Sequence, residues 1–164
     1  MICAKIRIRS ILVFYQRLSP SFHPLHRPPR RPKFAFRTMS WQTYVDSNLL
    51  GSGKIAKAAI IGLQGGVWAS SSGYTLSPAE QKAIVDGFSK PDSVQANGVR
   101  LAGQKFFTLS VSDRTIQAKK AADGAIIVKT KQAVLVTEYV APCQAPEVTP
   151  IVENLADYLI SVGY

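Results

Sequence analysis

The sequence has few of the residues that build catalytic and metal centres. It holds two cysteines, Cys3 and Cys143, and two histidines, His23 and His26. Both histidines fall in the first 38 residues, so residues 39–164 contain no histidine and one cysteine. This shortage argues against a disulfide framework, a zinc site of His and Cys ligands, and a nucleophile activated by histidine. We expect no enzyme, no metal and no cofactor, and a reducing intracellular compartment.

Long apolar runs are also missing. No run approaches the length of a transmembrane helix, and residues 11–15 are too short and too close to arginines for a secretory signal. A phosphate-binding loop is rejected as well. Gly51-Ser52-Gly53-Lys54 matches only part of that motif, which needs glycine where Asn48 stands and Ser or Thr where Ile55 stands.

Acidic residues are absent from the first 38 positions. Those positions carry nine Lys and Arg and five of the ten prolines, whereas residues 39–164 carry eleven basic and ten acidic residues, a net charge of +1. The high isoelectric point of the chain, about 9.9, therefore comes from the first 38 residues and does not indicate a nucleic-acid-binding domain. We predict a disordered extension at 1–38 and one domain at 39–164. A mitochondrial targeting segment is an alternative, but we favour Met39 as the usual start.

Three helices are predicted in residues 39–164. Ser40 caps the first, which Gly51-Ser52-Gly53 ends and whose apolar face is Trp41, Tyr44, Val45, Asn48 and Leu49. Ser77 and Pro78 begin the second, which reaches about Phe88. Thr149 and Pro150 begin the last, so Pro150 is expected to be a neutral helix-start proline. Its apolar stripe is Ile151, Val152, Leu155, Leu159 and Ile160.

Short strands fill the rest of this region. Residues 55–62 predict a buried strand, and Gly65-Gly66 turns the chain into residues 67–69. Further strands are expected at residues 99–101, 105–111, 115–119, 125–129 and 133–140, with a hairpin turn at Ala122-Asp123-Gly124 and a break at Lys90-Pro91-Asp92. The predicted fold class is α+β: a central antiparallel sheet of six to seven strands, with the N- and C-terminal helices packed together on one face and a further helix on the other.

Several motifs occur in order through residues 39–164. They are Ser40-Trp41-Gln42-Thr43-Tyr44-Val45-Asp46, Asn97-Gly98-Val99, Gly103-Gln104-Lys105-Phe106, Asp113-Arg114-Thr115-Ile116 and Leu155-Ala156-Asp157-Tyr158-Leu159-Ile160. Together they resemble the profilin family, most closely its fungal members. The resemblance implies a cytoplasmic, cytoskeletal monomer that binds actin monomers one to one, proline-rich proteins such as formins, and anionic phosphoinositide membranes. It implies no specific nucleic acid.

A groove for proline-rich peptides follows from this resemblance. Polyproline lacks backbone donors, so its recognition needs flat rings with outward-pointing N–H and O–H groups, which Trp and Tyr supply. The resemblance implies a groove of Trp41, Tyr44, Trp68, Tyr158, Leu159 and Tyr164. For any single ring the alternative is an ordinary core position. The groove requires the first and last helices to lie side by side.

An actin-binding surface and a phosphoinositide-binding patch are also implied by the resemblance. The actin-binding residues are Lys105, Arg114, Lys119, Lys120, Lys129, Gln144, Pro146, Thr149 and Asn154, and the phosphoinositide-binding residues are Lys105, Arg114, Lys119, Lys120 and Lys131. Ser110 departs from the pattern, because many family members carry arginine there. It supports an alternative, a proline-peptide adaptor with weak or no actin binding.

Overall fold

A computed structural model describes residues 40–164. The predictions about residues 1–38 and about Met39 lie outside the described part of the chain. The elements, in order, are α1 Trp41–Thr43, η1 Tyr44–Leu49, η2 Leu50–Ser52, β1 Lys57–Gly62, β2 Val67–Ser70, α2 Pro78–Ser89, α3 Pro91–Asn97, β3 Val99–Leu101, β4 Gln104–Val111, β5 Thr115–Lys120, β6 Asp123–Lys129, β7 Ala133–Tyr139 and α4 Ala145–Ser161.

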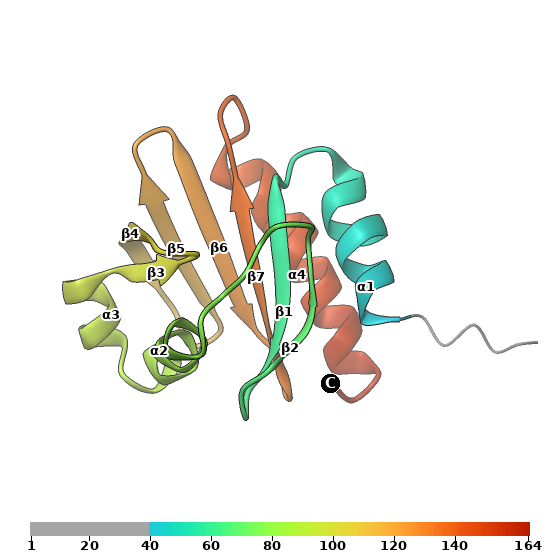
Figure 1. Ribbon diagram of the computed structural model, residues 1–164, viewed down its shortest axis with the longest axis horizontal. Coiled ribbons are helices and arrows are strands. Elements are labelled where there is room, and N and C mark those ends of the chain that lie inside the picture. Colours follow the sequence, from blue (N-terminus) through green and yellow to red (C-terminus); the bar gives the residue numbers. More distant parts are fainter. Residues whose placement is uncertain (1–39) are drawn as a thin grey trace, which may run out of the picture. The chain divides into compact units, whose positions relative to one another are not determined.

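The strands form one seven-stranded sheet in the order β2-β1-β7-β6-β5-β4-β3, and every neighbouring pair is antiparallel. Figure 1 shows α1 and α4 together on one face of the sheet, with α2 and α3 on the other. The predicted α+β fold class is confirmed. The second helix on the α2 side, α3, was missed.

Both sheet faces are buried at the centre, which explains the nearly continuous apolar strands. Along β6, Ile126 and Val128 pack with α4 and the first helix, whereas Ala125 and Ile127 pack with α2 and α3. Alternation of side chains along a strand produces this division. Every residue of β7 is buried. The sheet is therefore the middle layer between two apolar cores.

The last helix begins earlier than predicted. Gln144 is the N-cap of α4, and its N–H donates to the Glu147 side chain, at 3.4 Å. Pro146, rather than Pro150, is the helix-start proline, so the predicted start at Thr149 was wrong. Pro150 lies inside the helix, where it removes one backbone hydrogen bond.

Two other local predictions need correction. Lys90-Pro91-Asp92 is not a simple break, because Pro91 occupies the first turn of α3. The hairpin turn between β5 and β6 is Ala121-Ala122, since Lys120 already pairs with Asp123. Ala121 supplies the positive φ of that turn, and Gly124 lies within β6.

The first helix is present but wound more widely than predicted. After one turn of α-helix, η1 is a π-helix, in which Leu50 N–H donates to the Val45 carbonyl. Val45 and Leu49 are buried, whereas Asn48 is exposed and was wrongly placed on the apolar face. No helix among residues 40–164 is long and apolar enough to cross a membrane.

Candidate ligand-binding surfaces

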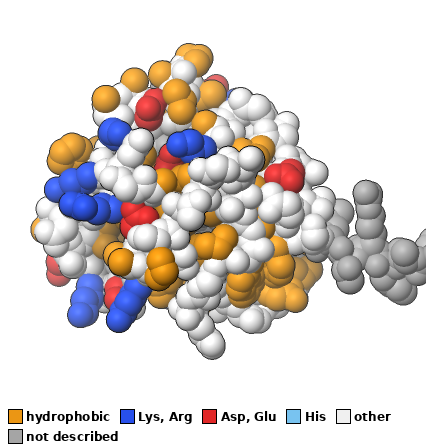
Figure 2. Space-filling view, viewed as in Figure 1, with side chains coloured by type: hydrophobic (Ala, Val, Ile, Leu, Met, Phe, Trp, Pro, Cys, Tyr) orange, Lys and Arg blue, Asp and Glu red, His pale blue; other side chains and the backbone are white. Residues whose placement is uncertain are grey.

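Five aromatic rings from the two ends of the domain and from β2 lie together. The Trp41 ring centroid is 5.7 Å from Tyr44, 4.6 Å from Trp68 and 4.9 Å from Tyr164. Tyr44 and Tyr158 are 6.0 Å apart, and Trp68 and Tyr164 are 6.2 Å apart. We call these five residues the aromatic surface. Figure 2 shows hydrophobic side chains gathered at the lower right, around the end marked C in Figure 1.

Three elements position the tryptophans and Tyr44. The Ser40 side chain accepts a hydrogen bond from Thr43 N–H, which fixes the start of the helix that carries Trp41 and Tyr44. Trp68 lies on edge strand β2 and rests against Gly62 of β1. A Cβ atom at Gly62 would lie 2.9 Å from Trp68 Nε1, so a larger residue there would displace the indole.

Tyr164 is positioned by the end of α4. Gly163 has a φ of 97°, a left-handed conformation that suits glycine. Gly163 N–H donates to the Ile160 carbonyl, at 3.2 Å, and Tyr164 N–H donates to the Leu159 carbonyl, at 2.8 Å. These two bonds form a Schellman motif, which turns the tail back towards the helix.

Leu159 does not belong on the ligand-facing side of this surface. Its side chain is 1% exposed and packs in the core between α4 and the sheet. Leu159 follows the apolar stripe of α4, whereas Tyr158, one position earlier, is 47% exposed. The expectation that Leu159 lines the groove is corrected to a role beneath it.

The aromatic surface combines apolar faces with hydrogen-bond donors. Interaction with the Tyr158 side chain, together with burial, raises the pKa of Tyr44 above its ordinary value. A tyrosine hydroxyl is protonated at neutral pH, so Tyr44 can act as a donor. Tyr164 is 41% exposed. Such a surface suits an apolar ligand whose polar groups are mainly acceptors.

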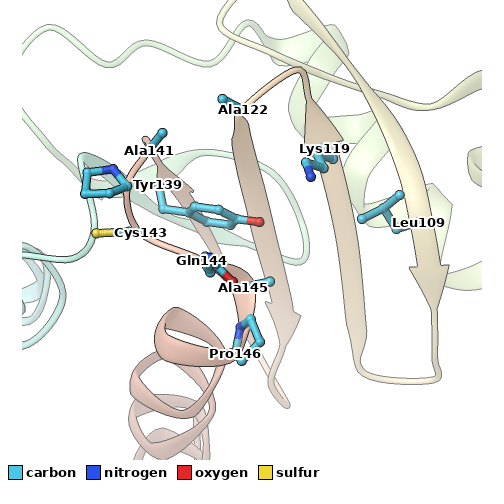
Figure 3. Close-up of a pocket in the computed structure, with 10 residues that line it drawn as sticks. Leu109, Lys119, Ala122, Tyr139, Ala141, Cys143, Gln144, Ala145 and Pro146 are labelled. Atoms are coloured by element: carbon cyan, nitrogen blue, oxygen red, sulfur yellow. The ribbon is translucent and has the colours of Figure 1, made fainter.

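A second exposed surface lies on β4 and β5. Phe107 and Leu109 are 66% and 58% exposed. Lys105 Nζ lies 5.7 Å from the Phe107 ring centroid. Leu109 and Lys119 line a hollow of about 590 Å³ whose other wall includes Gln144 and Pro146 at the start of α4. Figure 3 shows Leu109 and Lys119 on neighbouring strands, opposite this loop.

We call Lys105, Phe107, Leu109 and Lys119 the outer sheet face. It is exposed because α4 packs mainly on β6 and β7 and reaches β5 only near its start, where Thr115 bonds Glu153. The sequence prediction missed Phe107 and Leu109. Their signal is the run Phe106-Phe107-Thr108-Leu109, in which only Phe106 is buried.

The other residues predicted to bind actin do not all lie on the outer sheet face. Lys120 and Lys129 lie on the α2 side of the sheet, because side chains alternate along β5 and β6. Lys129 Nζ is 5.9 Å from the Phe88 ring of α2. Lys119 and Lys120 therefore do not share a face.

Residues on and beside α4 are also divided. Arg114 pairs with Asp157, at 2.6 Å. Thr149 is half-buried, and its hydroxyl donates to the Ala145 carbonyl. Asn154 is exposed one turn before Tyr158, on the flank of α4 nearer the first helix.

The predicted phosphoinositide residues do not form one patch. Lys105 and Lys119 share the outer sheet face, Lys120 lies on the opposite face, and Arg114 is paired with Asp157. Lys131 lies in the β6–β7 loop, where its Nζ donates to the Ile160 carbonyl. The five cations are thus spread over four places.

Comparison with known proteins identifies the family. The sequence profile of the family described as Profilin matches residues 39–164. The chain belongs to the profilin family. The profilin of Saccharomyces cerevisiae is 49% identical over 127 residues, which cover 77% of this chain and 100% of that protein. The structure of Acanthamoeba castellanii profilin IB is similar with a TM-score of 0.74 and 45% identity, covering 76% of this chain and 100% of that one.

A more distant profilin structure shares the fold. Mouse profilin IIa, in complex with a double repeat from the FH1 domain of mDia1, has a TM-score of 0.66 and 21% identity. The match covers 76% of this chain and 99% of that chain. At this identity the likeness concerns the fold alone.

Proposed function

We propose that this profilin binds monomeric actin one to one, binds proline-rich segments such as those of formins, and regulates actin assembly in the cytoplasm and cytoskeleton. It acts as a binding protein and not as an enzyme, through the domain at residues 39–164. The observation that carries the proposal is the contact of rings from both ends of this domain, with Trp41 and Tyr164 at 4.9 Å.

The aromatic surface supports recognition of proline-rich peptides. Its rings offer flat faces to proline side chains, and its indole N–H and phenol O–H groups can donate to the peptide carbonyls. The FH1 complex of mouse profilin IIa is an example of such a peptide partner on this fold. Each covered ring contributes on the order of 1–3 kcal/mol before ordering costs, which fits weak recognition of a short motif.

The outer sheet face supports actin binding. It joins two exposed apolar side chains, Phe107 and Leu109, to the cations Lys105 and Lys119. An apolar centre with a charged rim is the usual anatomy of a protein interface, and the cations suit an acidic partner. We propose Gln144 and Pro146 as its border at the start of α4.

Ser110 supports the alternative of an adaptor with weak actin binding. It pairs with Gln117 beside a bulge in β4, on the side of the sheet that carries Lys119. A charge expected in profilins is therefore missing from the proposed actin face itself.

Anionic phosphoinositide membranes are the third proposed partner. Lys105 and Lys119 are the predicted cations that share an exposed surface, and each attracts an anionic membrane by about 1 kcal/mol. We expect this binding to be weak and sensitive to salt.

Three single variants test the two main partners. Trp41→Ala should abolish retention on polyproline resin, because it removes the ring at the centre of the aromatic surface, and should leave actin binding intact. Lys119→Glu should weaken binding of actin monomers markedly in sedimentation assays. Lys120→Glu is the matched control, since it makes the same charge change on the opposite face. Unchanged retention of Trp41→Ala, or equal effects of the two lysine variants, would refute the corresponding surface.

A further inference from the structure

The β6–β7 loop holds the tail that carries Tyr164. Lys131 N–H donates to the Tyr164 carbonyl, at 3.2 Å, and Lys131 Nζ donates to the Ile160 carbonyl, at 3.3 Å. Gln132 Nε2 donates to the Gly163 carbonyl, at 2.8 Å. Three carbonyls at the end of α4 thus receive donors from two consecutive loop residues. We call Lys131 and Gln132 the tail clamp.

The loop is rigid enough for this purpose. Thr130 is buried, and its N–H donates to the Ala133 carbonyl, at 2.8 Å. Its hydroxyl donates to the same carbonyl and accepts from Ala133 N–H, both at 3.0 Å. These bonds fix the base of the hairpin between β6 and β7. The clamp residues therefore project from a fixed turn.

Apart from the tail clamp, the two backbone bonds of the Schellman motif hold the tail. Val162 and Tyr164 are exposed, and Gly163 adds backbone freedom. Helix ends fray when their last carbonyls lack partners. Nevertheless the Tyr164 ring stands edge-on to both tryptophans, at 85° to Trp41 and 81° to Trp68. The Schellman motif turns the tail, and the bonds from Lys131 and Gln132 anchor it to the β6–β7 loop, outside the helix.

We propose that Lys131 and Gln132 are positioning residues of the aromatic surface, which hold Tyr164 against Trp41 and Trp68 before a ligand arrives. The role in ligand binding rests on the proposed function. Preorganising a ring lowers the ordering cost of binding. Lys131 also brings a positive charge to the C-terminal end of α4, where it is favourable.

A double-mutant cycle in the full-length chain tests whether the tail clamp contributes to ligand affinity. Gln132→Ala should weaken the affinity for a synthetic polyproline peptide roughly threefold to tenfold, the effect of one lost hydrogen bond. In a Tyr164→Ala background the same substitution should have no further effect, because there is no ring left to position. Gln64→Ala is the matched control: this exposed glutamine lines a hollow that Trp68 and Gln132 also line, and its substitution should leave the affinity unchanged.

Tryptophan fluorescence tests the positioning without a ligand. The chain has two tryptophans, Trp41 and Trp68, and the Tyr164 ring contacts both. Gln132→Ala should shift their emission in the same direction as Tyr164→Ala, while the urea midpoint stays close to that of the original protein. If the original protein fails to bind the peptide, the proposed function fails. The fluorescence result still shows whether the tail clamp positions Tyr164. Unchanged emission in Gln132→Ala, or a loss of affinity that persists in the Tyr164→Ala background, would overturn the proposal.

Discussion

Glu138 is a carboxylate inside the core, and a single tyrosine is its main partner. Tyr74 donates a hydrogen bond of 2.6 Å to Glu138 Oε1, and Lys57 Nζ lies 3.9 Å from Oε2. Burial raises the pKa of Glu138 above its ordinary value, although the Tyr74 hydrogen bond and Lys57 act in the opposite direction. The folded state therefore binds this proton more readily than the unfolded state, so stability falls as pH rises through the raised pKa.

Replacing Tyr74 with Phe should destabilise the fold by about 1–3 kcal/mol at neutral pH, because a buried charged acceptor loses its donor. The loss should shrink as the pH falls through the pKa of Glu138, since a protonated carboxyl group needs the donor less. Urea unfolding at about pH 7 and about pH 4 measures both free energies.

Tyr139→Phe is the control for this prediction. Tyr139 is also buried, and burial alone raises the pKa of its hydroxyl. Its substitution should therefore show little pH dependence between the same two conditions. An equal loss for Tyr74→Phe at both pH values would contradict the proposed role of the Glu138 charge.

At the scale of elements, α4 carries parts of both proposed binding surfaces. Gln144 and Pro146 border the outer sheet face at its start, and Tyr158 and Tyr164 lie at its other end. Its buried stripe fixes it on β6 and β7. Pro150 is the irregular residue within it, exposed and beyond the first turn.

Pro150→Ala should stabilise the protein by about 1–2 kcal/mol, because it restores a helical hydrogen bond and removes the clash of the proline ring, an effect reduced by the greater freedom of the unfolded chain. Thermal and urea unfolding measure the change. Pro146→Ala is the control: a proline in the first helical turn replaces an N–H that has no partner, so its removal should be neutral or slightly destabilising. A less stable Pro150→Ala variant would contradict this account of Pro150.

At the scale of the whole molecule, the attraction of charged partners depends more on where the charges lie than on the net charge. The eleven basic and ten acidic residues of the domain nearly cancel. Figure 2 shows Lys and Arg side chains mostly on the left of that view, where Figure 1 has α2, α3 and strands β3 to β5. Lys105 and Lys119, the cations of the outer sheet face, are two of the eleven basic residues of the domain.

Two double variants test whether this face binds phosphoinositide membranes. Lys105→Glu with Lys119→Glu should remove most of the vesicle binding that depends on the outer sheet face. Co-sedimentation with vesicles that contain a polyphosphoinositide measures this loss. Lys120→Glu with Lys129→Glu changes the net charge equally on the other face and should have a smaller effect. The two proteins share the same first 38 residues, so their difference reports on the domain. Equal losses would mean that only net charge attracts the membrane.

Local signals in the sequence predicted much of the fold and part of the aromatic surface. Capping residues such as Ser40 and Ser77, and the period of the apolar positions, depend on neighbours a few residues apart. Where a local signal occurs twice, as with Pro146 and Pro150, the sequence left the helix start ambiguous. The structure places the N-cap at Gln144, whose N–H donates to the Glu147 side chain.

The sequence by itself determined a sheet buried on both faces, helices at each end of the domain, and rings available at both ends. Only the tertiary structure decided which strands α4 leaves uncovered, which face each lysine occupies, and that Lys131 and Gln132 hold the tail of Tyr164. Those features depend on contacts between residues about thirty or more positions apart. Such contacts are fixed by the packing of whole elements, which no short stretch of sequence encodes.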